Sequence, residues 1–294
     1  MVCWDSSSAL KKHVFDSLKK LNLSPSRQRG QNFLVDYSIL NYQIKQAKIS
    51  KNETILEIGG GIGNLSKCLV EESKKLFIVE SDRRLVLFLE NFLSNYSNVE
   101  IIQGDAVKIE FPKFDKCVSN LPYQISSPIT FKLLDYDFKQ AVLMYQKEFA
   151  DRFFASPGSK DYSRISVMMN LKANCSHLKT VKPSSFYPAP KVLSSVVSIT
   201  KKEDYENINH YDFGRFIILL FTQKKKTVRS VLVNVIKRKT KQNFQINQEI
   251  LQELPFLDSR IFNLTLVQLI EIYSHLKSKQ GEGLWSDMIS PNTK

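Results

Sequence analysis

Short apolar segments alternate with helical patterns between residues 54 and 146. Each apolar segment is four to six residues long and rich in aliphatic side chains, as is typical of strands buried in a sheet. The predicted strands are Thr54–Ile58, Leu76–Glu80, Val99–Gln103, Lys116–Ser119 and Ala141–Gln146. Apolar residues at helical spacing occupy Leu65–Val70 and Leu85–Leu93, which lie between strands. This alternation predicts an α/β fold, with a mainly parallel sheet covered by helices on both faces.

The pattern changes after residue 150. Lys147–Ala155 and Arg164–Lys172 have helical spacing, whereas Val192–Thr200 alternates like a strand. The charged segment Lys201–Asp204 then resembles a linker. Only helical patterns follow it, at Phe213–Phe221, Val228–Arg238, Gln248–Leu254 and Leu264–Leu276. We therefore expect a flexible polar lead-in at residues 1–26, the α/β domain at 27–203, a small all-helical domain at 204–280 and a polar tail at 281–294.

A glycine-rich loop, Glu57–Gly63, joins the first predicted strand to the first predicted helix. Glycine allows tight backbone bends and lets a ligand approach the chain closely. The dinucleotide fingerprint G-x-G-x-x-G is excluded, because Asn64 or Ser66 stands where its last glycine is needed. The E-x-G-x-G-x-G form instead resembles motif I of the class I S-adenosylmethionine-dependent methyltransferases. The cofactor-binding candidates in this loop are Glu57, Gly59, Gly61 and Gly63.

Two further carboxylates follow predicted strands. Glu80 ends the second strand, where an acid can accept hydrogen bonds from both ribose hydroxyls. Asp105, followed by Ala106, comes after the third strand and can accept from an adenine amino group. Because ligands of such sheets bind beyond the carboxyl ends of the strands, we expect these residues to hold the cofactor.

The segment Asn120-Leu121-Pro122-Tyr123 follows the fourth predicted strand. An adenine amine is a poor nucleophile, because its lone pair is delocalised into the ring. An Asn oxygen and the next backbone carbonyl can accept both of its N–H groups and turn the lone pair toward a methyl donor. Pro122 offers no competing N–H donor, and Tyr123 can stack on the base. These four residues are therefore the candidates for catalysis, with alignment rather than a general base as the main effect. Asn120 is also a candidate for cofactor binding.

The ordered motifs resemble the ribosomal RNA adenine N6-dimethyltransferases of the small-subunit, kasugamycin-sensitivity type. The resemblance covers residues 27–276, and further similar segments lie at 30–36, 146–152, 157–164, 186–192 and 223–227. It implies a Rossmann-like class I methyltransferase sheet with a C-terminal all-helical RNA-binding domain. It also implies that Gln31, Asn32 and Leu34 line the cofactor pocket, and that Phe186 stacks on the target base opposite Tyr123.

The implied activity is transfer of methyl groups from S-adenosyl-L-methionine to N6 of two adjacent adenosines in a 3′-terminal hairpin loop of small-subunit ribosomal RNA. The implied partner is the immature small ribosomal subunit. Two alternatives stay open: a non-catalytic, transcription-factor-like nucleic-acid-binding relative, and a resistance methyltransferase of large-subunit RNA. The intact glycine loop, Glu80, Asp105 and Asn120–Tyr123 favour a catalyst, and the segments at 157–162 and 186–192 favour the small-subunit type.

The charge balance supports a nucleic-acid partner. Lys and Arg number 42 against 29 Asp and Glu, a net charge of +13. Residues 213–248 contain no acidic side chain. The RNA-binding candidates in this stretch are Lys224, Lys225, Lys226 and Arg229. Lysines stand at 224 and 225 where the family usually has arginines, so a forked phosphate contact is lost there.

Other residue types exclude further classes. The four cysteines show no C-x-x-C spacing, so we expect reduced thiols, with Cys117 in the core. The four histidines have no ligand spacing, and we expect no metal. No apolar stretch approaches the roughly 20 residues of a membrane span, and no secretory signal is visible. We therefore expect a monomeric cytoplasmic protein.

Overall fold

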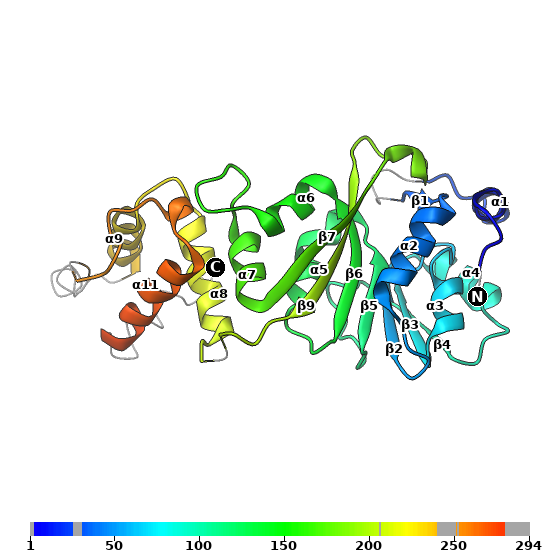
Figure 1. Ribbon diagram of the computed structural model, residues 1–294, viewed down its shortest axis with the longest axis horizontal. Helices are drawn as coiled ribbons and strands as arrows, with labels where there is room; N and C mark the ends of the chain where they lie inside the picture. The colour runs from blue at the N-terminus through cyan, green and yellow to red at the C-terminus, as the bar shows by residue number, and fades with distance from the viewer. Residues whose placement is uncertain (1–2, 26–30, 206, 240–250, 252, 280–294) are drawn as a thin grey trace. The chain divides into compact units, whose positions relative to one another are not determined.

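The computed structural model describes residues 3–25, 31–205, 207–239, 251 and 253–279, with only the backbone at 238, 239 and 279 (Figure 1). The chain divides into two compact units. The first unit comprises Met1–Ala150 and Ala173–Lys201, and the second comprises Asp151–Lys172 and Lys202–Lys294. Residues 151–172 therefore group with the helical part of the chain, whereas the sequence placed them in the α/β domain. The expected tail at 281–294 lies outside the described residues.

A seven-stranded sheet forms the centre of the first unit, in the order β4-β3-β2-β5-β6-β9-β7 (Figure 1). The strands are β2 (Thr54–Ile58), β3 (Lys75–Glu80), β4 (Val99–Gln103), β5 (Lys116–Asn120), β6 (Gln140–Gln146), β7 (Ala173–Val181) and β9 (Ser194–Lys201). The first five in this spatial order are parallel, and β9 is antiparallel to both β6 and β7. The five strands predicted before residue 150 are confirmed within one residue at each end.

Helices cover the sheet. Consecutive residues of β2, β5 and β6 are buried, which requires cover on both faces. The α-helices between residues 37 and 151 are α2 (Tyr37–Ala47), α3 (Ser66–Glu72), α4 (Arg83–Phe92), α5 (Ser126–Leu133) and α6 (Lys147–Asp151). Side chains of α2, α3 and α4, such as Leu40, Leu69 and Leu89, join one core cluster with Ile78 and Val118 of the strands. The predicted fold class is confirmed.

The lead-in is not loosely held. Residues Ser7–Lys20 form helix α1, which begins at Ser6, whose hydroxyl accepts a hydrogen bond from Ala9 N (3.1 Å). Val14 and Leu18 are buried in a cluster with Ile62 of the glycine loop. The expectation of a flexible segment is wrong because a few apolar residues at i, i+4 spacing suffice to anchor one face of a polar helix.

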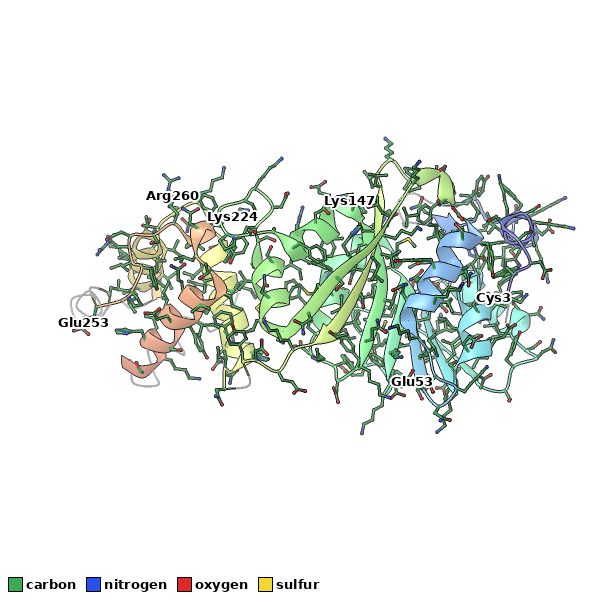
Figure 2. The ribbon with its side chains drawn as sticks, in the orientation of Figure 1. Cys3, Glu53, Lys147, Lys224, Glu253 and Arg260 are labelled. Atoms are coloured by element: carbon green, nitrogen blue, oxygen red, sulfur yellow. A yellow bond between two sulfur atoms is a disulfide. The ribbon has the colours of Figure 1, made fainter. Side chains whose placement is uncertain are left out.

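The expectation of four reduced thiols is also wrong. Cys3 and Cys68 form a disulfide (Cys3 is labelled in Figure 2). The other two thiols are free; Cys117 is buried and Cys175 is partly buried. Trp4 fixes the same segment, because its Nε1 donates to Asn64 O (2.9 Å). The cysteines are 65 residues apart, so a search for short spacings does not detect the pair.

A small antiparallel sheet joins β1 (Phe33–Leu34) to β8 (Phe186–Tyr187), with Leu34 opposite Phe186. Val35 N extends the pairing by donating to Ser185 O (2.8 Å), next to the turn η4 (Pro183–Ser185). This pairing brings together two segments that are far apart in the sequence.

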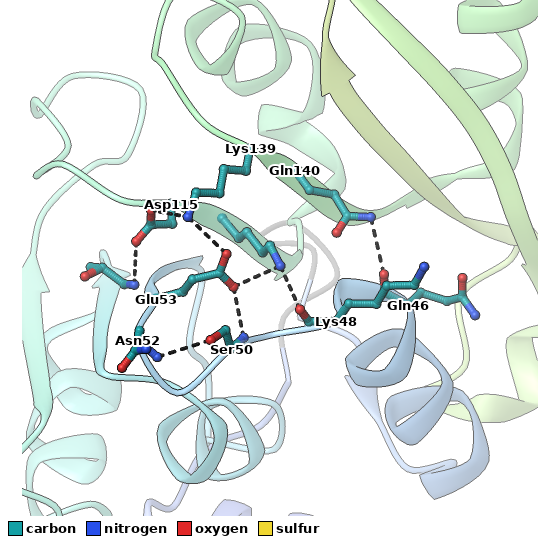
Figure 3. Close-up of polar contacts among 10 residues, drawn as sticks. Gln46, Lys48, Ser50, Asn52, Glu53, Asp115, Lys139 and Gln140 are labelled. Atoms are coloured by element: carbon teal, nitrogen blue, oxygen red, sulfur yellow. Dashed lines mark hydrogen bonds and ion pairs between the residues drawn. The ribbon is translucent and has the colours of Figure 1, made fainter.

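Polar residues stabilise the edge where the parallel strands begin (Figure 3). Lys116 Nζ lies 2.9 Å from Glu53 Oε2, and both side chains are about nine-tenths buried. Lys139 Nζ lies 3.2 Å from Glu53 Oε1 and 3.0 Å from Asp115 Oδ1. These ion pairs tie the starts of β2, β5 and β6 together.

The second unit is helical. It contains η3 (Arg152–Phe154), α7 (Arg164–Lys172), α8 (His210–Phe221), α9 (Val228–Lys239), η5 (Ile261–Asn263) and α11 (Leu266–Lys279). Phe213, Phe216 and Tyr273 are buried in its core. Tyr162 joins the segment before α7 to this core, because its hydroxyl donates to Leu264 O (2.8 Å). Most of the helix expected at 248–254 lies outside the described residues.

Membrane-spanning helices and metal-binding groups can be assessed only in the described residues. No helix there is long and apolar enough to cross a membrane. No group of three or more His, Cys, Asp and Glu side chains in that part of the chain is arranged to hold a metal ion.

Candidate functional site

A cavity of about 460 Å³ lies in the first unit, beyond the carboxyl ends of β2, β3, β4 and β5. Its position follows from the strand order. β2 pairs with β5 only at Ile55↔Lys116 and Leu56↔Cys117, after which Ile58 N donates to the Ser119 hydroxyl (2.8 Å) instead of a backbone carbonyl. The two strands therefore diverge where the chain order of the sheet reverses, which is the usual ligand position in such folds.

The glycine loop forms one wall of this cavity. Gly59 and Gly61 have φ values of 80° and 57°, a region that other residues rarely adopt. A Cβ atom on Gly59 would lie 3.2 Å from Pro122 Cδ, so glycine allows the loop to pack against the Asn120–Tyr123 turn. Gly63 does not line the cavity; a Cβ atom there would lie 2.8 Å from the Phe92 ring. Gly63 therefore serves packing within the first unit.

Glu80 fixes the loop to the end of β3. Its Oε2 accepts from Gly61 N (3.0 Å), and its Oε1 accepts from Ser81 N (2.7 Å) and Asp82 N (3.0 Å). The Ser81 hydroxyl makes a longer contact with Oε1 (3.5 Å) and takes up the last of about four acceptor positions, so a ligand hydroxyl would replace this weak bond. Glu80 thus both shapes the cavity and retains the capacity to bind a hydroxyl group.

Glu57 is a fully buried carboxyl group in the wall of the cavity. Burial, with a smaller contribution from the charge of Glu80, raises the pKa of Glu57 from 4.5 to about 8, although the Ser66 hydroxyl opposes the shift. Among the described residues, no donor satisfies Glu57 Oε2 with hydrogen-bond geometry. A buried acid without a full set of partners is suited to a cationic ligand.

Asn120 ends β5 and contributes an acceptor to the cavity. Its Oδ1 is buried, and no hydrogen-bond partner for this atom exists among the residues that the structure describes. Leu121 and Pro122 follow it along the cavity wall. Because an unpaired buried acceptor costs free energy, this oxygen is prepared for a donor from outside the protein.

Two aromatic residues line the same cavity. Tyr123 is held by a hydrogen bond between its hydroxyl and Ser194 Oγ (2.7 Å), and Ser194 is fully buried at the start of β9. Burial raises the pKa of Tyr123, so its hydroxyl stays neutral at physiological pH. Phe186 reaches the cavity through the pairing of β8 with β1. The cavity thus combines acidic groups with aromatic rings.

Comparison with known proteins places the chain in a family. The family model described as "Ribosomal RNA adenine dimethylase" matches residues 23–268. The chain belongs to this family.

The most informative relatives of this family member cover nearly the whole chain. Proteins named "Probable ribosomal RNA small subunit methyltransferase A" from Thermococcus sibiricus and Pyrococcus furiosus are 41% and 42% identical, over 90% of this chain and 97% and 96% of their own. The crystal structure of a dimethyladenosine transferase from Plasmodium falciparum is 32% identical, with a TM-score of 0.74 over 84% of this chain and 98% of that chain. The 23S rRNA methyltransferase ErmE, at 23% identity and a TM-score of 0.60, shares the fold.

The structure of this dimethylase-family chain brings almost all of its predicted site residues to one cavity. Those that line it are Gln31, Asn32, Leu34, Glu57, Gly59, Gly61, Glu80, Asp105, Ala106, Asn120, Leu121, Pro122, Tyr123 and Phe186. The sequence reasoning missed Gly60, Ser81, Leu85 and Gly104, which also line the cavity. Their positions could have indicated this, because each lies in or beside a loop that follows a strand.

The four RNA-binding candidates, all in the second unit, have different surroundings. Lys224 Nζ donates to Lys160 O (3.1 Å) and Tyr162 O (2.6 Å), and Arg229 forms a two-pronged ion pair with Asp258 (Lys224 is labelled in Figure 2). Lys225 and Lys226 are exposed. A stretch without acidic residues in the sequence can therefore still lie beside acidic side chains in the fold, as Arg229 does beside Asp258.

Proposed function

We propose that this protein transfers methyl groups from S-adenosyl-L-methionine to N6 of adenines in small-subunit ribosomal RNA and forms N6,N6-dimethyladenosine. One observation carries the proposal. The buried Asn120 Oδ1, which has no hydrogen-bond partner in the described part of the chain, lies in the same cavity as the acidic residues and the aromatic rings. Membership of the adenine dimethylase family and the names of relatives about 40% identical support the same activity.

The residues of the cavity fit the cofactor. When bound, S-adenosylmethionine supplies a methyl group activated by a positively charged sulfonium. Glu80 and Asp105, and Glu57 once it is ionised, give the cavity negative charge in a chain whose net charge is +13. The acceptor position of Glu80 that the Ser81 hydroxyl reaches only at 3.5 Å is suited to one ribose hydroxyl, and Asp105, which is half-exposed, to the adenine amino group. A volume of about 460 Å³ is typical of a site for a nucleoside-sized ligand.

The acceptor amine would be aligned by Asn120 and Leu121. Asn120 Oδ1 and the Leu121 carbonyl oxygen would each accept one N–H of the adenine amine, which localises the nitrogen lone pair. Pro122 has no N–H that could compete for these oxygens. Tyr123 and Phe186 would stack on the base after it has left its neighbours in the RNA. Orientation and exclusion of water then account for the rate, without a general base.

The proposed RNA target is a pair of adjacent adenosines in a 3′-terminal hairpin loop, on an immature small subunit. The exposed Lys225 and Lys226 are available for phosphate contacts in the second unit. The monomeric state and the cytoplasmic location stay predictions.

The test is methyl transfer to immature small subunits from labelled S-adenosylmethionine, with the modified adenines mapped by mass spectrometry. Large-subunit RNA as substrate tests the resistance-methyltransferase alternative. Asn120→Ala should lower turnover at least 100-fold while S-adenosylmethionine affinity stays within a few fold, because the amide orients the acceptor. Asn91→Ala, an exposed change on α4, is the matched control. A wild-type protein that binds RNA but methylates no adenine would support the non-catalytic alternative.

A further inference from the structure

Two aromatic rings contact each other on the surface of the first unit. The ring centroids of Phe15, on α1, and Tyr187, on β8, are 4.5 Å apart, with an angle of 61° between the ring planes. Both residues are substantially exposed, at 40% and 38%. Exposed aromatic rings in contact with each other offer a surface on which a planar ligand can stack.

The pair lies beside the cavity. Tyr187 pairs directly with Phe33, which lines the cavity, and directly paired residues place their side chains on the same face of the sheet. Helix α1 is held in place because Val14 and Leu18 pack in the cluster that contains Ile62 of the glycine loop. The aromatic pair is therefore fixed next to the wall that would hold the target base.

Positive charge lies beside Phe15 on α1. Phe15 has Lys11 and Lys12 four and three residues before it and Lys19 four residues after it. All three lysines therefore share its face of the helix, and all three are exposed. Asp16 is the single acidic residue of α1. Lys182 and Lys191 are exposed on either side of Tyr187 in the sequence.

We propose that Phe15, Tyr187 and the neighbouring lysines of α1 form a docking surface for single-stranded RNA that flanks the target adenine. A base next to the target would stack on the ring pair, and its phosphates would contact Lys11 and Lys19. Aromatic platforms bordered by basic side chains are the general means by which proteins bind single strands. Extraction of the target base also leaves its neighbours without stacking, which the platform would replace.

This inference rests on the proposed function, because it assigns an additional contact to the same RNA. It extends the RNA-binding surface to α1, all of which precedes the family match at residues 23–268. RNA contact outside the cavity would then not be confined to the helical second unit.

The first experiment measures RNA affinity and stacking. The probe is an RNA hairpin with two adjacent loop adenines, in which 2-aminopurine replaces the next nucleotide. Phe15→Ala and Tyr187→Ala should each weaken binding about 5- to 100-fold and remove the fluorescence quenching that stacking causes. Phe15→Leu, which retains apolar contact but no ring face, should behave like Phe15→Ala. Affinity for S-adenosylmethionine and the melting temperature should stay near the wild-type values.

Leu87→Ala is the matched control, because Leu87 is an exposed apolar residue of α4, with 56% exposure. It should leave RNA affinity and fluorescence unchanged.

The second experiment measures the salt dependence of RNA binding. Lys11→Glu combined with Lys19→Glu should reduce the slope of log affinity against log salt concentration by about 1.4, since each single-strand phosphate contact contributes roughly 0.7. The control combines Lys74→Glu with Lys113→Glu. Both control lysines are exposed and precede parallel strands, at the sheet edge opposite the cavity, and the change in net charge is identical.

The outcomes separate the two proposals. If the wild-type protein methylates small subunits but both ring variants bind RNA as tightly as Leu87→Ala, the docking surface is wrong and the proposed function stands. If the ring variants instead abolish self-association and leave RNA affinity unchanged, the pair is a contact between copies of the chain. A wild-type protein that binds no RNA overturns both proposals.

Discussion

At the scale of single residues, Glu57 is a carboxyl group whose raised pKa brings its titration into the neutral range. Its folded-state pKa of about 8 means that the carboxyl is mostly protonated at pH 7 in the absence of a ligand. A cationic cofactor favours the ionised form, so S-adenosylmethionine affinity should rise by up to about tenfold per pH unit from pH 6 to 8. Calorimetry across this range measures the effect.

Glu57→Gln should flatten this pH profile, because the amide does not titrate. A wild-type profile that is already flat between pH 6 and 8 would mean that Glu57 keeps its proton when the cofactor binds.

Tyr123 and Ser194 form a second residue-scale pair. Tyr123→Phe keeps the ring but removes the hydroxyl that contacts Ser194 Oγ, so the ring is held less firmly. We expect a loss of about 1 kcal/mol in stability and a larger share of monomethyl product, since a loosely held base leaves before the second transfer. Mass spectrometry of digested RNA gives the mono-to-dimethyl ratio.

Ser194→Ala should shift that ratio in the same direction, and the double variant should add little to either single change. Additive effects would show that the two side chains act independently.

At the scale of elements, α1 is attached to the glycine loop by more than apolar packing. His13 Nε2 lies 2.9 Å from Ile62 O, and the Cys3–Cys68 disulfide closes a long loop. Cys3→Ser should lower the free energy of unfolding by about 2–4 kcal/mol, because the unfolded chain regains conformational freedom. Urea denaturation measures this loss, and dithiothreitol should reproduce it in the wild-type protein.

Cys175→Ser, at a partly buried free thiol, is the control for this prediction. If it lowers stability as much as Cys3→Ser, the loss cannot be attributed to the cross-link.

At the scale of the whole molecule, the two ends of the sheet have separate tasks. The carboxyl ends of the strands form the cavity, while Glu53, Lys116, Asp115 and Lys139 tie the opposite edge together. Lys116→Met should cost about 3 kcal/mol of stability, the lower part of the range for a broken buried ion pair, because Lys139 still contacts Glu53. S-adenosylmethionine affinity should not change, since Lys116 is remote from the cavity.

The same network predicts the response to acid. Hydrogen bonds from Ser50 N and from both lysines outweigh burial and lower the pKa of Glu53, and Thr54 N and Lys139 lower that of Asp115. Carboxyls with lowered folded-state pKa values contribute stability above their unfolded values, near pH 4, and lose it as the pH falls through the folded values. Thermal melting from pH 6 to 3 should show a steeper decline for the wild-type protein than for Lys116→Met.

The sequence by itself determined the elements whose signal is local. The strands of the parallel sheet are short segments rich in aliphatic residues, and the glycine loop needs φ values above zero at Gly59 and Gly61. Because parallel strands bring their carboxyl ends to one edge, Glu80, Asp105 and Asn120 could also be placed in a common site from their positions alone.

The tertiary structure decided what depends on contacts between distant segments. It paired β8 with β1, joined Cys3 to Cys68, and gave Lys224 and Arg229 partners within the protein. It also showed that α1 is a packed helix rather than a flexible lead-in. Residues far apart in sequence meet only when the whole fold repays the entropy of closing the chain between them, so no local pattern reports their contact.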